Sequence, residues 1–343
     1  AGPQPVAPGA TLWLVRIQIE NVIGGGGADQ ITGNAADNVF SGLGGADVFV
    51  GGGGVDRVLE IADADFTATD AALTIDAEID SLLGIEELQL TGGASGNVID
   101  ATGFTGTTIL SGEGGGDTLR GGTGTDYLIG GADNDTLEGN TGDDFYVFDV
   151  DFVLGDDTIS ETGGSDTLDF SSTSSESISV DLEELALQIV HPTNLGLDLD
   201  TAASIENVIG GNQDDTIRGN ALVNRITGGP GNDELYGRGA SDIVVETRDA
   251  NFILTTTSLN IGTEVDLLDS MNRAILTGGV SNNTIDATAA SGSVQLFGLV
   301  GNDLLFGGSG GDILEGGAGN DDLFGGAGSD DYLFDTLQSL GSD

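Results

Sequence analysis

The residues most able to do chemistry in this sequence are aspartates that recur at steps of nine residues. Their carboxylate oxygens are hard ligands, and a calcium ion takes about six to eight oxygens from carboxylates and backbone carbonyls. The recurring aspartates are Asp29, Asp47, Asp56, Asp117, Asp126, Asp135, Asp144, Asp215, Asp233, Asp242, Asp303, Asp312, Asp321 and Asp330. Asn38 and Asn224 stand at the two remaining places of the same period. The spacing therefore predicts a series of metal-binding loops.

Each of these residues is the sixth of a nonapeptide, and sixteen nonapeptides form four blocks that begin at Gly24, Gly112, Gly210 and Gly298. The eighth residue is large and apolar in all sixteen. Neighbouring side chains of a strand point to opposite faces, so the eighth residue would point inward while those beside it face solvent. Two nonapeptides would then make one coil, and successive coils would stack as parallel strands.

Residues 121–129 read Gly-Gly-Thr-Gly-Thr-Asp-Tyr-Leu-Ile, and residues 316–324 read Gly-Gly-Ala-Gly-Asn-Asp-Asp-Leu-Phe. This pattern resembles the RTX, or hemolysin-type calcium-binding, repeat family. The resemblance implies an all-β fold, an elongated right-handed parallel β-roll or β-solenoid with calcium in its turns. It also implies that each ion sits between two loops of one flank, 18 residues apart in sequence.

These implied pairs give an expectation of about eight calcium ions. The pairs are Asp29 with Asp47, Asn38 with Asp56, Asp117 with Asp135, Asp126 with Asp144, Asp215 with Asp233, Asn224 with Asp242, Asp303 with Asp321, and Asp312 with Asp330. We expect the two pairs that contain asparagine to bind calcium more weakly, because one formal charge of attraction is missing.

Glycines of the loops are expected to serve the metal as well. Glycine adopts a positive φ without a Cβ penalty, so the backbone can reverse within a few residues and its carbonyl oxygens can approach an ion. The glycines assigned to the sites are Gly24, Gly26, Gly112, Gly114, Gly121, Gly130, Gly228, Gly298, Gly307 and Gly316.

The charge balance calls for such a cation. Asp and Glu number 57 against 8 Lys and Arg, a formal net charge of −49. A chain this acidic repels phosphate backbones and anionic lipids, which excludes nucleic-acid binding, and it has no apolar run long enough for membrane insertion. Stacked carboxylates would raise one another's pKa and oppose folding unless a cation neutralises them. With no cysteine and one histidine, calcium is favoured over zinc.

The nonapeptide pattern also repeats as a whole, since Asp29 and Asp215 and every equivalent pair are 186 residues apart. We assign 1–18 to an N-terminal cap or a cloning remnant, 19–149 to copy 1 with nonapeptides 24–59 and 112–147 around a non-motif tract 60–111, 150–204 to a connecting β segment with degenerate repeats at Asp157 and Asp166, 205–335 to copy 2 with nonapeptides 210–245 and 298–333, and 336–343 to a tail.

Two expectations concern residues outside the nonapeptides. The tract 66–107 and its twin 252–293 are interpreted as the same coil continuing without metal loops. Acidic residues outside the motif, such as Glu86, Glu87, Glu183 and Glu184, are expected to be ordinary surface charge.

Catalysis is not expected. His191 is the only histidine and precedes Pro192 in a polar stretch, which predicts a loop without chemistry. The sequence has neither the His-Glu-x-x-His motif of zinc proteases nor the Gly-x-Ser-x-Gly elbow of lipases, and no lysine that could complete a phosphate-binding loop. We therefore expect the chain not to be an enzyme.

The sequence favours a calcium-binding structural segment of a large secreted bacterial adhesin, surface-layer or matrix protein, located outside the cell or at its surface. The family resemblance suggests type I secretion, which passes unfolded chains. Partners besides calcium would be other copies of the chain or cell-surface glycans. Two alternatives remain open: a calcium-folded secretion and stability module of an RTX exoenzyme or toxin, and a calcium-dependent surface that binds glycans or another partner.

Overall fold

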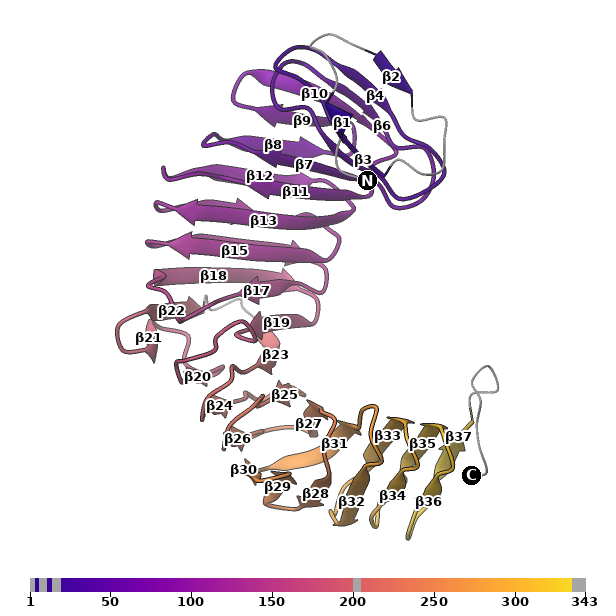
Figure 1. Cartoon of the computed structure of the whole chain (residues 1–343). Helices are drawn as coiled ribbons and strands as arrows, with labels where there is room; N and C mark the ends of the chain where they lie inside the picture. The colour runs from indigo at the N-terminus through magenta and orange to yellow at the C-terminus, as the bar shows by residue number, and fades with distance from the viewer. Residues whose placement is uncertain (1–3, 6–10, 14–19, 200–204, 335–343) are drawn as a thin grey trace. The chain divides into compact units, whose positions relative to one another are not determined.

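The computed structural model describes residues 4–5, 11–13, 20–199 and 205–334, and the regular elements among them are β-strands (Figure 1). The predicted cap at 1–18, apart from two short strands, and the predicted tail at 336–343 lie outside the described residues. None of the described residues forms a helix that could cross a membrane. The predicted all-β solenoid fold is confirmed.

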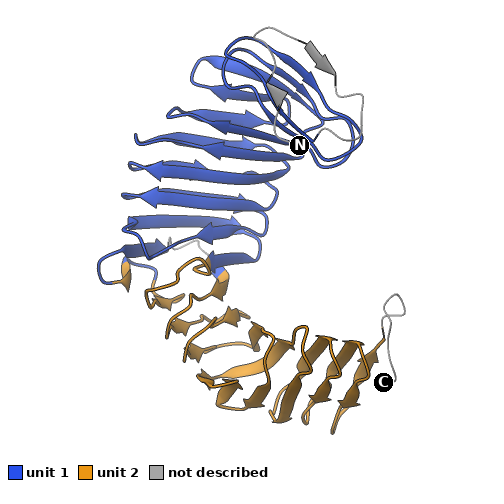
Figure 2. Cartoon of the chain, in the orientation of Figure 1, with its two compact units in different colours: residues 1–168, 185–187, 192–205 blue, residues 169–184, 188–191, 206–343 orange. Residues whose placement is uncertain are grey.

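The chain divides into two compact units (Figure 2). Unit 1 comprises residues 1–168, 185–187 and 192–205, and unit 2 comprises residues 169–184, 188–191 and 206–343. In each unit the chain passes back and forth between two sheets of mainly parallel strands, so that consecutive nonapeptides contribute alternately to one sheet and the other.

The strands of unit 1 follow the nonapeptide period. One sheet runs in the order β1 (Gln4–Pro5), β3 (Asn21–Ile23), β5 (Val39–Ser41), β7 (Arg57–Ile61), β11 (Glu87–Thr91), β13 (Thr107–Gly114), β15 (Asp126–Ala132), β17 (Phe145–Val147) and β19 (Asp166–Asp169). The other runs in the order β2 (Thr11–Trp13), β4 (Gln30–Thr32), β6 (Val48–Val50), β10 (Glu78–Leu83), β9 (Ala72–Ile75), β8 (Phe66–Thr69), β12 (Val98–Gly103), β14 (Thr118–Arg120), β16 (Thr136–Thr141), β18 (Gly155–Gly163) and β22 (Leu195–Leu199).

Unit 2 is built in the same way. One sheet runs in the order β23 (Ile205–Ile209), β25 (Arg225–Thr227), β27 (Asp242–Thr247), β31 (Met271–Thr277), β33 (Val294–Val300), β35 (Ile313–Ala318) and β37 (Asp331–Leu333). The other runs in the order β20 (Ser179–Asp181), β24 (Thr216–Arg218), β26 (Glu234–Tyr236), β30 (Glu264–Asp269), β29 (Ser258–Ile261), β28 (Phe252–Thr255), β32 (Thr284–Ala289), β34 (Leu304–Phe306) and β36 (Asp322–Phe324). The short strand β21 (Gln188–His191) also lies in this part of the chain.

Within the nonapeptide blocks, parallel pairing joins residues one coil apart. Val22 pairs with Phe40 and Phe40 with Val58 on one sheet, and Ile31 pairs with Phe49 on the other. Because the same apolar side chain recurs at each level, every coil buries its apolar row against the next. The predicted coil of two nonapeptides is thus present.

The core consists of the eighth residues of the nonapeptides. Fourteen of the sixteen are at most 1% exposed: Ile31, Phe40, Phe49, Val58, Leu119, Leu128, Leu137, Tyr146, Ile217, Ile226, Leu235, Val244, Leu305 and Leu314. Leu323 is half-buried and Tyr332 is 43% exposed, because β36 and β37 are the last strands of their sheets and no described strand stacks on them.

The expectation that the coil simply continues through 66–107 is only partly met. β11 and β13 continue the parallel stack, but β8, β9 and β10 form an antiparallel meander, and β28, β29 and β30 repeat it in unit 2. Two-residue turns connect these strands, and Asp76 and Gly262 take the left-handed conformation in them (φ 51° and 61°). Tight turns of this kind join antiparallel neighbours, not parallel ones.

The inward position of the eighth residue can be tested in one strand. Leu128 is fully buried between Leu110 and Tyr146, whereas its neighbour Ile129 is partly exposed. We expect Leu128→Ala to lower the free energy of unfolding by about 2–5 kcal/mol and Ile129→Ala by about 0.5 kcal/mol or less. Urea unfolding in saturating calcium measures both, and equal losses would contradict this placement of the core.

Candidate metal centre

Aspartate side chains connect successive coils through the backbone. In each predicted pair, Oδ1 of the later aspartate accepts a hydrogen bond from the backbone N–H of the sixth residue one coil earlier, at 2.6–3.1 Å. For example, Asp29 N–H donates to Asp47, and Asp117 N–H donates to Asp135. The structure therefore brings the two members of all eight predicted pairs into contact. We call each such series of residues a carboxylate ladder.

The ladders extend beyond the nonapeptides, to acids that sequence reasoning did not assign to a site. The further acceptors are Asp80 for Asp47 N–H, Asp157 for Asp135 N–H, Asp166 for Asp144 N–H, Asp266 for Asp233 N–H and Glu86 for Asp56 N–H. Asp157 and Asp166 had a detectable signal as degenerate repeats. Asp80 and Asp266 lie far out of period, and only their separation of one whole copy could have identified them. Glu86, although exposed, is more than the ordinary surface charge we expected.

The loops that carry the sixth residues adopt two conformations. In closed loops, the N–H of the second residue donates to the side-chain oxygen of the sixth at 2.6–2.9 Å; the sixth residues of these loops are Asp29, Asn38, Asp126, Asp215, Asn224 and Asp312. In open loops, the second residue is left-handed, and so is the fourth except in the loop of Asp242; the sixth residues are Asp47, Asp56, Asp117, Asp135, Asp144, Asp233, Asp242, Asp303, Asp321 and Asp330. Each ladder within a block begins with a closed loop and continues with open ones.

Asparagine occurs in closed loops only. Asn38 and Asn224 each accept the N–H of the residue four positions earlier, a task for which one amide oxygen suffices. The amide nitrogen of Asn224 in turn donates to Glu206 O and Asn220 Oδ1, both at 3.1 Å. The two exceptions to the aspartate pattern therefore stand where the carboxylate charge is not needed. Weaker calcium binding at their pairs remains a prediction.

Open loops leave carboxylate oxygens buried without a hydrogen-bond donor. These oxygens are Oδ2 of Asp56, Asp117, Asp135, Asp144, Asp233, Asp242 and Asp303, and of the non-nonapeptide residues Asp157 and Asp266. A buried acceptor without a partner costs about 1–3 kcal/mol, and more when it is charged. The repetition of this feature in one kind of loop points to a missing positive group.

The first glycine of each nonapeptide has a different role from the one we expected. Among the assigned glycines, Gly24, Gly26, Gly112, Gly114, Gly121, Gly130, Gly228, Gly298, Gly307 and Gly316 all lie outside the left-handed region. The expectation of positive φ at these positions was wrong. A Cβ on Gly112 would lie 2.2 Å from Asp117 Oδ2 and 2.5 Å from the carbonyl oxygen of Gly130, so the first residue must leave room for these oxygens. Gly26 and Gly114, at the third position, have no such crowding.

The space beside the first glycine fits a hard cation. A point at the Cβ position of Gly298 is 2.4 Å from Asp303 Oδ2 and 2.5 Å from the carbonyl oxygen of Gly316 in the next coil. Calcium–oxygen distances are about 2.3–2.6 Å, and both donors are the hard oxygens that calcium prefers. The ligands would be the sixth-position aspartate and a glycine carbonyl of the following coil. When bound, calcium would supply the positive charge that this site lacks.

The electrostatics of the ladders agree with this fit. Burial raises the pKa of Asp144, Asp157 and Asp233 to about 8, and neighbouring carboxylates act in the same direction. Burial likewise raises the pKa of Asp135 to about 7. Without a counter-charge these groups resist ionisation, so the folded ladder is suited to a cation or to protons but not to bare carboxylates.

Comparison with known protein families identifies the loops. The family model of the RTX calcium-binding nonapeptide repeat matches residues 23–58, 111–146, 203–221, 219–245 and 297–332. These segments are RTX calcium-binding repeats. No curated protein matches the chain as a whole. The RTX repeats contain all the closed and open loops described above, so calcium is the ion that the ladders hold.

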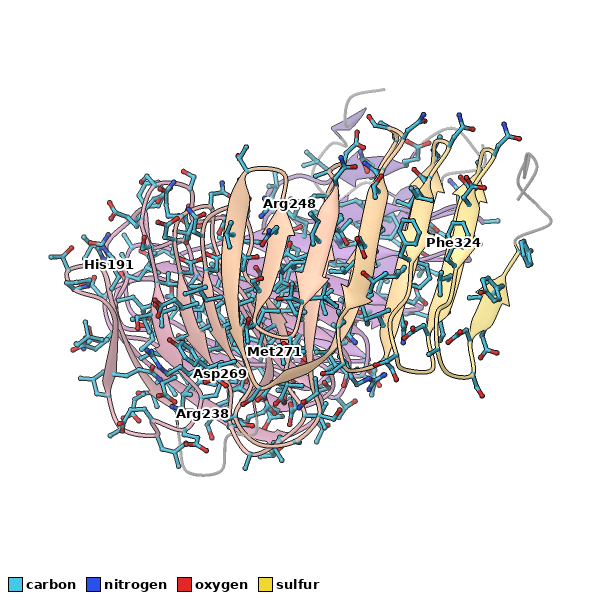
Figure 3. The ribbon with its side chains drawn as sticks, turned by 90° about the horizontal axis from the view of Figure 1, so that it is seen from below. His191, Arg238, Arg248, Asp269, Met271 and Phe324 are labelled. Atoms are coloured by element: carbon cyan, nitrogen blue, oxygen red, sulfur yellow. The ribbon has the colours of Figure 1, made fainter. Side chains whose placement is uncertain are left out.

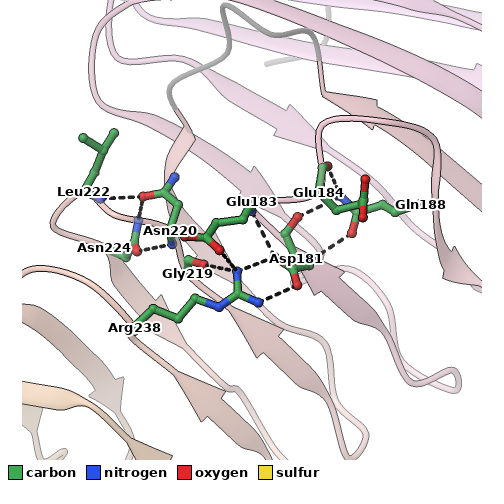
Figure 4. Close-up of polar contacts among 9 residues, drawn as sticks. All are labelled: Asp181, Glu183, Glu184, Gln188, Gly219, Asn220, Leu222, Asn224 and Arg238. Carbon is green, nitrogen blue, oxygen red and sulfur yellow. Dashed lines mark hydrogen bonds and ion pairs between the residues drawn. The ribbon is translucent and has the colours of Figure 1, made fainter.

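One RTX loop contains a cation of its own. Arg238, the second residue of the Asp242 loop, donates to both carboxylate oxygens of Asp181 at 2.6 and 2.7 Å and to the carbonyl oxygen of Gly219 at 3.0 Å (Figure 4). Glu183 lies 3.1 Å from the same guanidinium. Burial would raise the pKa of Asp181, but the guanidinium outweighs it and lowers that pKa. The first-glycine carbonyl of this Asn224 loop is thus already bound to a cationic side chain.

His191 lies apart from the RTX loops. Its Nε2 is 3.2 Å from the carboxylate of Glu176, and it ends β21 at the edge of the ribbon in Figure 3. It is partly buried, and its surroundings provide no nucleophile or second metal ligand among the described residues. The sequence placed it in a loop, whereas the structure places it in a strand.

Two glycines of one RTX loop provide a matched test of the site. Gly112→Ala would push a methyl group against Asp117 Oδ2 and Gly130 O, whereas Gly114→Ala meets only one carbonyl oxygen, at 4.0 Å, and needs no left-handed backbone. We expect Gly112→Ala to raise the calcium concentration needed for half-folding several-fold and Gly114→Ala to change it by less than about twofold. Calcium titration by circular dichroism measures both midpoints. Equal midpoints for the two variants would show that the space beside Gly112 is not used.

The raised pKa values predict that acid can partly replace calcium. Asp144, Asp157 and Asp233 keep their protons up to about pH 8 in the folded chain but lose them near 3.8 when unfolded. The calcium-free folded state is therefore favoured fully below the unfolded pKa and loses this stability as the pH rises through about 8. We expect a chain stripped of calcium on a chelating resin to gain β-structure between pH 8 and pH 4, as followed by circular dichroism. A gain of β-structure in the opposite direction would contradict this assignment.

Proposed function

We propose that this chain is a structural segment of a large secreted bacterial adhesin, surface-layer or matrix protein, and that extracellular calcium folds it. The observation that carries the proposal is the series of buried Oδ2 atoms in the open loops, which have no protein donor. Folding brings these oxygens together, and a bound divalent ion removes the repulsion that folding creates.

The switch follows from the concentration of free calcium. Inside a cell, where free calcium is low, a formal charge of −49 keeps the chain extended and suited to export as an unfolded polypeptide. Outside, each independent site adds RT ln(1 + [L]/Kd) to the stability of the folded state. Many sites acting together would make folding a steep function of calcium.

The repetition of the whole pattern favours a spacer or adhesive segment over a catalyst. A solenoid contacts only its neighbouring coils, so copies can be added without disturbing the core. Within the described residues, the acidic groups serve the ladders and the lone histidine pairs with Glu176. Other copies of the chain or cell-surface glycans would then be its partners.

Calcium-dependent folding of the intact chain tests the proposal. In chelator we expect the far-ultraviolet spectrum of a disordered chain and a large hydrodynamic radius. In a few millimolar calcium we expect a β-spectrum and a smaller radius, because metal binding supplies the free energy of folding. Magnesium at the same concentration is the control, since its demand for near-ideal octahedra suits carbonyl-rich loops poorly. A β-spectrum that is the same in chelator and in calcium would overturn the proposed switch.

A further inference from the structure

One group of carboxylates lies outside the pattern of paired loops. Asp144 precedes β17, Glu161 lies in β18 and Asp166 begins β19, and all three side chains are fully buried. One oxygen of each lies within 4.8 Å of the others, which no other group of three acidic residues achieves in the described part of the chain. Glu161 belongs to no nonapeptide, and nothing in its sequence position identifies it as a ligand.

An acidic cluster alone does not make a site, but here an unsatisfied oxygen points into the cluster. Asp144 is 0% exposed, and its Oδ2 accepts no hydrogen bond. A point at the Cβ position of Gly139 lies 2.6 Å from Asp144 Oδ2, 2.4 Å from Glu161 Oε2 and 2.6 Å from the hydroxyl oxygen of Tyr146. At this point a side-chain carboxylate takes the place that a backbone carbonyl has beside Gly298.

The hydrogen bonds around Glu161 hold its carboxylate at this point. Oε1 accepts the backbone N–H groups of Thr162 at 2.8 Å and Gly163 at 3.3 Å, and Oε2 accepts the hydroxyl of Tyr146. The ion pairs among the described residues do not include Asp144, Glu161 or Asp166. Three buried carboxylates thus share one place with no cationic side chain.

Two other buried glutamates show what is special about Glu161. Glu60 accepts the N–H of Gly42 at 2.6 Å, and Glu246 accepts the N–H of Gly228 at 3.0 Å, so each binds the first glycine of an open loop directly. In the Asp144 loop, the N–H of Gly139 donates to the Tyr146 hydroxyl instead, at 2.9 Å. Tyr146 therefore frees Glu161 to face Asp144.

We propose that Asp144, Glu161 and Asp166 form an interior calcium site at the end of the second nonapeptide block, separate from the loop pairs of the RTX repeats. The donors are oxygens only, which favours a hard divalent cation over a softer metal. Three carboxylates outweigh the charge of one ion, and their burial slows exchange with solvent. This site should therefore hold its ion longer than the loop sites do. The inference rests on the proposed calcium switch and adds one ion to it.

The number of calcium ions bound by the full chain tests this site. Native mass spectrometry, or equilibrium dialysis against calcium, should count one ion fewer in Glu161→Gln than in the unmodified chain. Glu60→Gln is the matched control, because Glu60 is also buried and also accepts a backbone N–H, and it should keep the full number. In addition, the slowest phase of calcium release into chelator should disappear in Glu161→Gln only.

The outcomes separate this site from the switch. If the chain folds with calcium but Glu161→Gln binds as many ions as the unmodified chain, the interior site is wrong and the switch stands. If the unmodified chain binds no calcium, both fall. Should Glu161→Gln fail to fold, Tyr146→Phe keeps the test open, since terbium in this site would be excited through Tyr146. Tyrosine-excited terbium emission should then fall several-fold relative to Tyr127→Phe, and an equal effect of the two variants would refute the site.

Discussion

The structure depends on burying carboxylates that face one another across neighbouring coils. Each coil places an aspartate one level above the last, and its Oδ1 binds the backbone of the coil below. This contact positions the coil, but it also removes the carboxylate from water, which costs free energy unless the charge is neutralised. Calcium lets the chain keep the contact without that cost, so the metal and the fold form one system.

The same contact explains the residue types along each nonapeptide. The eighth residue fills the core, and the sixth supplies the carboxylate. The first is glycine because the carboxylate lies against its Cα: a methyl group on Gly112 would be 2.2 Å from Asp117 Oδ2. Left-handed geometry is required at the second and fourth positions of open loops, where even Leu43 and Glu113 adopt it. A glycine in this motif can therefore serve either packing or backbone conformation.

The periodic part of this architecture was predictable from sequence, because period nine fixes the strands, the inward residues and the partners of each aspartate. The aperiodic part was not. The meander of β8, β9 and β10 depends on two-residue turns around Asp70 and Asp76, which are weak signals beside a strong repeat. Glu161 approaches Asp144 through tertiary packing, and no spacing rule relates the two. The difference between closed and open loops is also a property of the stack, since it depends on which coil comes first.

The ends of the ladders show why the tracts between the blocks are acidic. The N–H of the last aspartate in a ladder is buried and needs an acceptor, which only the next coil can provide. Asp80 accepts from Asp47, and Asp266 accepts from Asp233, although neither acceptor belongs to a nonapeptide. Both lie in the strand of the meander that pairs in parallel with the preceding coil, β10 on β6 and β30 on β26. The tract without the motif therefore completes the last loop of the block before it, so a block and the coil that follows it must fold together.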